Sequence, residues 1–281
     1  MDVGIGLPNQ VRGVGPDGIV EWAKRAEAAG FSTLGTIDRL AYPGYEPLTA
    51  LAAAAAVTER IVLMTDILIA PLRSNTALLA KEAATVDHLS GGRLVLGVAP
   101  GAREDDYVLG GVDFAGRGRA FDDQLEELVR LWREGAVAPA SPRGERPRLM
   151  VGGTNPRAYR RAATYADGWT MGGGPPDAMA ATAPKVREAF VQAGREEEPR
   201  LVALCYYALG PDAEAAARAS LGHYYGWLGD YADRIVASAV TDAETARAYV
   251  DAFSQAGADE LIMFPAATDP DQVDLLAEAV L

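Results

Sequence analysis

The sequence predicts an α/β protein, specifically a (β/α)8 TIM barrel with inserted loops and helices. Short apolar runs alternate along the whole chain with segments whose apolar residues follow a helical period. Consecutive runs lack the short hairpin turns of antiparallel strands, which indicates parallel pairing. No shift in composition divides the 281 residues, a usual length for one such barrel. We therefore expect residues 1–281 to form one domain.

The segment 60–101 shows the repeating unit most clearly. Residues 61–64 and 94–99 are apolar runs typical of buried strands, and residues 75–89 between them have helical spacing. Strand, helix and strand in this order form a parallel βαβ unit. Polar residues follow both strands, and the carboxyl ends of parallel strands are where α/β enzymes usually carry their active sites.

The other elements continue the alternation. In the first helix, Asp17 is the expected N-cap and Gly30 the expected C-terminal residue. Residues 211–239 are expected to be a helical insertion, and residues 101–117 a long loop. The remaining strands are expected at 3–7, 33–37, 148–151, 169–171, 201–208 and 260–264, and the remaining helices at 17–29, 47–58, 118–134, 156–166, 176–193, 242–256 and 269–280.

Composition excludes several classes of function. The net charge of −13 argues against binding to nucleic acid or to anionic membranes. The longest apolar run, residues 48–57, is too short to span a bilayer, and no signal peptide is evident. A single cysteine, Cys205, fits a reducing compartment, so we expect a cytoplasmic protein. Two histidines and no Cys/His ligand spacing argue against a metal site.

Several catalytic motifs are absent. The sequence has no G-x-x-x-x-G-K-[ST] phosphate loop, no dinucleotide fingerprint after the first strand and no G-x-S-x-G elbow. His88 is expected at the end of a helix, where a cation interacts favourably with the helix dipole. Chemistry, if present, is therefore expected to come from a bound cofactor.

The strongest local site is LMVGGTNP at residues 149–156. A strand there ends in Gly152 and Gly153, with Asn155 as N-cap and Pro156 in the first turn of a helix. Glycines let backbone N–H groups approach a ligand, and the helix N-terminus attracts anions. The pattern indicates a phosphate site, although simple capping of a barrel helix explains it too. Three basic residues follow on the helix: Arg157, Arg160 and Arg161.

Four segments together resemble the bacterial luciferase-like monooxygenase family, the flavin- and deazaflavin-dependent barrels. They are GFSTLGTIDRL (30–40), RIVLMTDILIAPLRS (60–74), KEAATVDHLSGGRLVLGVAPG (81–101) and VGGTNPRAYRRAATYADGW (151–169). The resemblance covers nearly the whole chain. It implies that FMN or coenzyme F420 binds with its ring at the carboxyl ends of the strands.

The resemblance also implies individual site residues. The family's phosphate site maps onto Gly152, Gly153 and Thr154, beside Arg157. A non-prolyl cis peptide that contacts the ring in many members corresponds to the bond between Asp66 and Ile67. An acidic position near the ring corresponds to Asp38, and a polar position beyond the fourth strand corresponds to Asp105.

The chain departs from its relatives at two positions. Many deazaflavin-dependent members have a histidine where this chain has Arg39, and some have an acting glutamate where it has Ala102. Those acid–base roles are therefore not transferred. Arg39 would instead pair with Asp38 or hold a negative ring or substrate, which makes these two the candidate catalytic residues.

Two segments are candidates for covering a substrate pocket. The loop 101–117, which contains Tyr107, is long enough to be a lid. The insertion carries His223, Tyr224 and Trp227 in one short stretch. Such a cluster lines an apolar pocket, or else it packs in a core or a dimer interface. An apolar pocket would suit a carbon-rich small molecule.

The leading hypothesis is an oxidoreductase. With FMN it would insert one atom of molecular oxygen into a substrate, and with F420 it would transfer hydride. We expect a homodimer, supplied with reduced cofactor by a separate flavin or F420 reductase. The alternative is a non-catalytic binding barrel that has lost the usual acid–base residues. A phosphate-binding aldolase or isomerase would need a strand-end lysine, and the three lysines are elsewhere.

Overall fold

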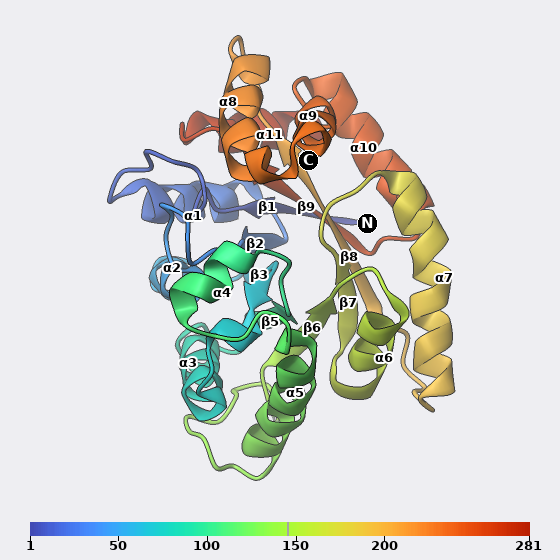
Figure 1. Ribbon diagram of the computed structural model, residues 1–281. Coiled ribbons are helices and arrows are strands. Elements are labelled where there is room, and N and C mark those ends of the chain that lie inside the picture. Colours follow the sequence, from blue (N-terminus) through green and yellow to red (C-terminus); the bar gives the residue numbers. More distant parts are fainter. Residues whose placement is uncertain (145) are drawn as a thin grey trace.

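The computed structural model describes residues 1–144 and 146–281 and confirms the predicted barrel (Figure 1). Around the barrel the strands follow the order β3-β2-β1-β9-β8-β7-β6-β5, and pairing of β3 with β5 closes the circle. All these pairs are parallel. The strands are β1 (Asp2–Gly6), β2 (Thr33–Thr36), β3 (Val62–Thr65), β4 (Leu68–Ile69), β5 (Leu94–Ala99), β6 (Arg148–Gly152), β7 (Gly168–Met171), β8 (Arg200–Tyr207) and β9 (Glu260–Pro265).

The third barrel strand is broken into β3 and β4. Both pieces pair with β5, with Leu63 opposite Leu94 and Leu68 opposite Val98. Two residues, Asp66 and Ile67, lie between the pieces. The eight predicted strands are therefore present, and the interruption accounts for a ninth in the described part of the chain.

Helices surround the barrel, and local capping explains where several begin. The side chain of Asn75 accepts a hydrogen bond from the Leu78 N–H at the start of α3. Gly30 ends α1 with a φ of 98°, as predicted, but Asp17 makes no side-chain capping bond. The helices are α1 (Gly18–Ala29), α2 (Pro47–Ala55), α3 (Thr76–Leu89), α4 (Glu104–Gly110), α5 (Arg117–Arg133), α6 (Pro156–Tyr165), α7 (Pro176–Gln192), α8 (Ala213–Tyr225), α9 (Asp230–Ala237), α10 (Ala243–Gln255) and α11 (Asp271–Val280).

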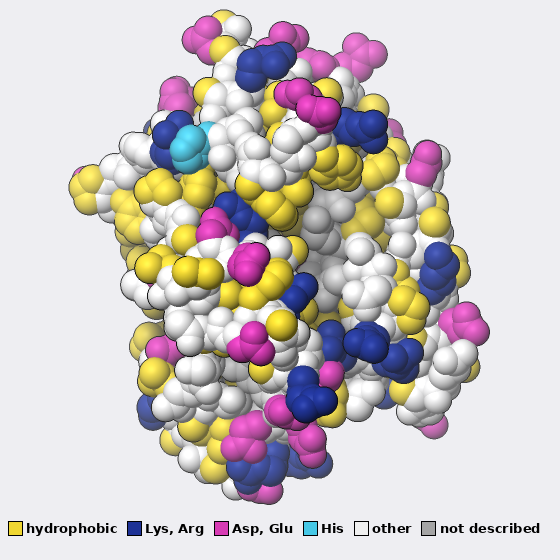
Figure 2. Space-filling view, viewed as in Figure 1, with side chains coloured by type: hydrophobic (Ala, Val, Ile, Leu, Met, Phe, Trp, Pro, Cys, Tyr) yellow, Lys and Arg dark blue, Asp and Glu magenta, His cyan; other side chains and the backbone are white. Residues whose placement is uncertain are grey.

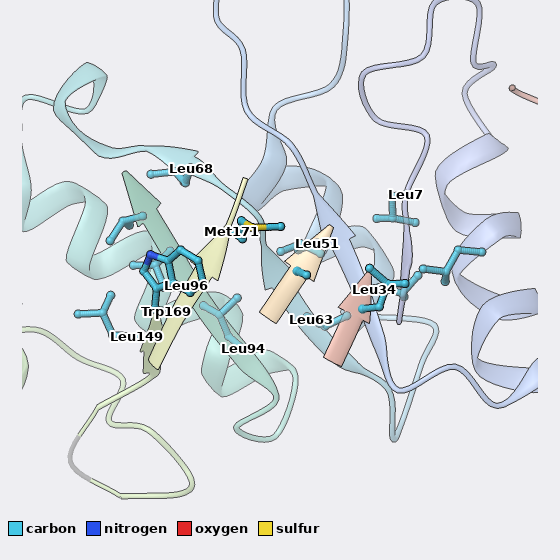
Figure 3. Close-up of a cluster of buried hydrophobic side chains, with 14 of the residues drawn as sticks. Leu7, Leu34, Leu51, Leu63, Leu68, Leu94, Leu96, Leu149, Trp169 and Met171 are labelled. Atoms are coloured by element: carbon cyan, nitrogen blue, oxygen red, sulfur yellow. The ribbon is translucent and has the colours of Figure 1, made fainter. Parts of the chain in front are cut away.

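The core has an inner and an outer layer because side chains alternate along each strand. Leu63 points outward into the layer between strands and helices, together with the fully buried Trp169 (Figure 3). Met64, the next residue of β3, packs inside the barrel with Ile262 and Phe264. Burying each such side chain contributes about 1.5–3 kcal/mol. The barrel is thus filled by side chains below its carboxyl-end mouth.

Two segments depart from the simple βα repeat. The expected loop 101–117 contains α4, which the sequence analysis did not predict. The expected insertion 211–239 contains α8, a 3-10 turn at Gly226–Leu228, and α9, and its two helices lie side by side (Figure 1). Within the described residues, no helix combines the length and apolar character needed to cross a membrane.

Candidate functional site

The carboxyl ends of the barrel strands bring together side chains that are distant in sequence. Asp66 and Ile67 follow β3, and Gly152 ends β6. Because all strands run parallel, these ends meet at one mouth of the barrel. In Figure 2 the face carrying α4, α6 and α8 is hollowed at its centre, and Lys and Arg side chains gather over α6.

Asp66 is the most unusual residue at this mouth. Its peptide bond to Ile67 is cis, as the family resemblance implies. The side chain is 1% exposed, and its Oδ1 accepts a hydrogen bond of 2.7 Å from Thr170 Oγ1 on β7. Its Oδ2 has no hydrogen-bond partner in the described part of the chain. Burial raises the pKa of Asp66 to about 7, although the bond from Thr170 opposes the shift.

Gly152 and Gly153 form a cradle that a larger residue would fill. A Cβ at Gly152 would lie 2.5 Å from Cδ1 of Ile67, so this side chain packs directly on the strand end. Gly153 has a φ of 125°, and a Cβ there would lie 2.9 Å from Cβ of Ala158. Its carbonyl accepts a hydrogen bond of 2.7 Å from Trp169 Nε1, which holds the turn. A side chain at Gly152 would displace that of Ile67, whereas Gly153 is favoured by its positive φ and by the proximity of Ala158.

The N-terminus of α6 is only partly available to a ligand. The Asn155 side chain accepts hydrogen bonds from the N–H groups of Arg157 and Ala158, as its predicted capping role requires. Thr154 and the Arg157 side chain are exposed beside this cap. An anion here would use Thr154, the glycine backbone and arginine side chains.

Asp38 does not pair with Arg39, so this predicted pair is wrong. Asp38 is 4% exposed and forms an ion pair with Arg73, while the Ile69 N–H donates to it at 2.8 Å. It thereby fastens the end of β2 to β4 and the turn that follows β4. Within the described chain, its bonds are those of a structural anchor.

Arg39 pairs instead with two acidic residues near α4. Its Nε donates to Asp106 at 2.6 Å and its Nη2 donates to Asp105 at 2.9 Å. Asp106 is fully buried, whereas the Asp105 side chain is 45% exposed. The third guanidinium nitrogen, Nη1, is buried without a hydrogen-bond partner among the described residues. Among the described residues, this nitrogen is therefore a donor that is left for a ligand or water.

Asp105 therefore belongs to an arginine cluster. It also accepts a hydrogen bond of 2.7 Å from Arg103. Hydrogen bonding to Arg103 lowers the pKa of Asp105, so the carboxylate stays ionised at neutral pH. The predicted residue is at the mouth, but its contacts are with protein cations.

Aromatic side chains of α8 cover another part of the mouth. Tyr224 lines a small apolar recess with Ile37, Tyr206 and Phe264, and the Arg39 guanidinium lies 5.5 Å from its ring centre. The neighbouring Tyr225 joins its hydroxyl to that of Tyr206 at 2.5 Å. Burial raises the pKa of Tyr206 well above its usual value, so its hydroxyl keeps its proton.

The other predicted pocket residues lie at the rim or away from it. His223 is exposed and its Nδ1 is 3.0 Å from the Tyr42 hydroxyl. Trp227 is 50% exposed, with the Arg103 guanidinium 4.6 Å from its ring centre. Tyr107 is fully buried, and its hydroxyl bonds to the Pro100 carbonyl. It packs α4 onto the end of β5, so we propose no ligand contact for it.

Four residues of this region were not singled out from the sequence: Arg73, Asp106, Thr170 and Tyr206. Arg73, Asp106 and Tyr206 each contact a partner on another element, and such a contact leaves no local signal in the sequence. Thr170 has a local signal, because a polar residue inside a short apolar strand predicts a side chain that points into the barrel. In the described residues, no group of three or more His, Cys, Asp or Glu side chains has metal-binding geometry.

Comparison with known proteins gives consistent matches. The model of a family described as luciferase-like monooxygenase matches residues 1–275. An uncharacterized protein of Mycobacterium tuberculosis is 34% identical over 212 residues, covering 62% of this chain and 71% of that protein. The F420-dependent glucose-6-phosphate dehydrogenase of Kribbella flavida is 28% identical over 221 residues, covering 70% of this chain and 66% of that protein.

A solved structure shares the fold at lower identity. An F420-dependent secondary alcohol dehydrogenase in complex with an F420–acetone adduct superimposes with a TM-score of 0.81. The match covers 99% of this chain and 98% of that chain at 20% identity. At this identity the likeness shows the fold alone.

Proposed function

The chain belongs to the luciferase-like monooxygenase family, and on this premise we propose that it is an oxidoreductase that uses coenzyme F420 or FMN. The observation that carries the proposal is the cradle at the carboxyl end of β6. Gly152 and Gly153 have no side chains, the Ile67 side chain packs against Gly152, and Gly153 has a positive φ that favours glycine. Beside them, Asp66 and Arg39 each keep one buried polar atom without a partner in the described chain. A planar polar ring with a phosphate tail fits this combination.

Each part of such a cofactor has a candidate partner. Gly152, Gly153 and Thr154 would hold the phosphate, because backbone and hydroxyl donors at a helix N-terminus suit an anion. Asp66 and Ile67 would contact the ring from the broken strand. Asp105 is bonded to Arg39 and Arg103 and would act on a bound ligand only through these arginines.

The cations over α6 favour F420 over FMN. Arg161 is occupied, since its Nε bonds to Asp122 at 2.5 Å. Arg157 and Arg160 are exposed on the same helix, Arg157 beside the N-cap and Arg160 on the side that faces α7. The F420 tail is longer and more anionic than the single phosphate of FMN, so it gains more from two exposed cations on a protein of charge −13. The F420-dependent relative is a further argument for this cofactor.

The bound cofactor would supply the redox chemistry, which is hydride transfer for F420 and oxygen activation for FMN. The residues of the chain bind and orient. Arg39 would donate from Nη1 to a negative group of the substrate, while Tyr224 and Phe264 present apolar surface to its carbon skeleton. The substrate class we propose is therefore a small, carbon-rich molecule. A homodimer and a separate reductase for the cofactor remain proposals from the family resemblance.

Titration with each cofactor tests this function. We expect the variant carrying both Arg157→Gln and Arg160→Gln to bind F420 about tenfold more weakly at low salt, because two exposed ion pairs contribute up to about 1 kcal/mol each. FMN binding should change much less. Quenching of cofactor fluorescence measures both affinities.

The matched control is Arg133→Gln, an exposed arginine at the end of α5. It removes the same charge far from α6 and should leave both affinities unchanged. An equal loss for F420 and FMN would contradict the preference for F420. A wild-type protein that binds neither cofactor would favour the non-catalytic binding barrel.

A further inference from the structure

Asp66 is built to make one more hydrogen bond than the protein supplies. Oδ1 is held by Thr170, and Oδ2 is buried without a partner in the described residues. An unpaired buried polar atom is unfavourable, and in a native protein it calls for a partner such as an ordered water, an ion or a ligand. The atom lies at the same mouth as the cradle of Gly152, so a ligand held there is within the same site.

The surroundings of Asp66 do not balance a negative charge. Glu260 of β9 is the neighbour whose charge acts on Asp66, and it opposes ionisation. Tyr206 of β8 keeps its proton because burial raises its pKa well above the usual value, so it brings no positive charge to Asp66. Thr170 of β7 offers only a neutral hydroxyl. The arginines that follow neighbouring strand ends are engaged elsewhere: Arg73 with Asp38, and Arg39 with Asp105 and Asp106. A carboxyl in this position retains its proton at mildly acidic pH.

We propose that Asp66, as the protonated acid, donates a hydrogen bond from Oδ2 to the ring of the bound cofactor. Flavin and deazaflavin rings both carry carbonyl oxygens that accept such a bond, and their negative charge on reduction strengthens it. This inference rests on the proposed function. It makes cofactor binding depend on pH through one residue inside the barrel.

The direction of the pH dependence of cofactor binding follows from the protonation state of Asp66. Burial raises the pKa of Asp66 to about 7, so the donor is present below neutrality and lost above it. Above pH 7 a carboxylate faces the ring carbonyls, and binding weakens. Between pH 6 and pH 8.5 we expect the affinity of the wild-type protein for the oxidised cofactor to fall about tenfold beyond any change that the free cofactor shows.

Asp66→Asn is the decisive variant. The amide keeps the shape of the acid and can donate at every pH, so its affinity should stay level where that of the wild type falls. The control is Asp87→Asn, since Asp87 is also 1% exposed and has an unpartnered Oδ2 within the described chain. Asp87 lies at the opposite end of the barrel, where it accepts from the Leu94 N–H. This control should retain the wild-type profile.

Fluorescence titrations of wild type, Asp66→Asn and Asp87→Asn at pH 6, 7 and 8.5 separate the outcomes, with thermal unfolding as a check on folding. Loss of the extra pH dependence in Asp66→Asn alone supports the inference. The same profile in wild type and Asp66→Asn overturns it while leaving the proposed function intact. Absence of binding by both cofactors to the wild type at every pH overturns the proposed function and this inference together.

Discussion

Replacing Gly153 by leucine is expected to lower the affinity for F420 and for FMN by about a hundredfold or more. Its φ of 125° disfavours any side chain, and a Cβ would lie 2.9 Å from Cβ of Ala158. The turn must shift, which moves the backbone donors away from the phosphate. Losing two hydrogen bonds to a charged group costs about 3 kcal/mol, which is about a hundredfold in affinity. Fluorescence titration of each cofactor measures the change.

Gly194→Leu is the matched control for this substitution. Gly194 has a φ of 72° and open space around it, and it follows α7 at the opposite end of the barrel. The control therefore also introduces a leucine at a positive φ without reaching the cradle, and it should bind both cofactors as the wild type does. A folded Gly153→Leu protein with unchanged affinity would place the phosphate site elsewhere.

The parts of this site that were predictable from the sequence have local signals. Gly152, Gly153 and Asn155 form a strand end, a turn and a cap within a few residues, and each follows from backbone geometry. The barrel itself follows from apolar runs and helical periods, which are also local. The cis bond after Asp66 has no such signal and was inferred only from the family resemblance.

The parts that were not predictable depend on contacts between distant segments. Asp38 meets Arg73, which is 35 positions away, and Arg39 meets Asp106, which is 67 positions away. The expected pair of Asp38 with Arg39 fails because consecutive side chains in a strand-like segment point to opposite sides. Asp38 therefore faces the turn after β4, and Arg39 faces α4. The helix α4 itself is only seven residues long, too short for a periodic pattern.

Arg39→Met is expected to lower the free energy of unfolding by about 3–5 kcal/mol. The Arg39 side chain is 3% exposed and Asp106 is fully buried, so the substitution leaves a buried carboxylate without its cation. Asp106 also accepts from the N–H groups of Leu40 and Ala41. Loss of the ion pair should therefore loosen α4 from the end of β2. Chemical denaturation monitored by circular dichroism measures the change.

Two further variants determine whether the effect arises from this buried pair. Asp106→Asn removes the charge but can still accept from both N–H groups, so combining it with Arg39→Met should recover part of the lost stability. Arg130→Met breaks ion pairs with Glu127 and Glu134 on the surface of α5, where solvent screens the charges, and should change stability little. A loss in Arg39→Met no larger than in Arg130→Met, with no recovery in the double variant, would mean that Asp106 tolerates burial without Arg39. The two N–H donors of Leu40 and Ala41 alone would then hold α4 in place.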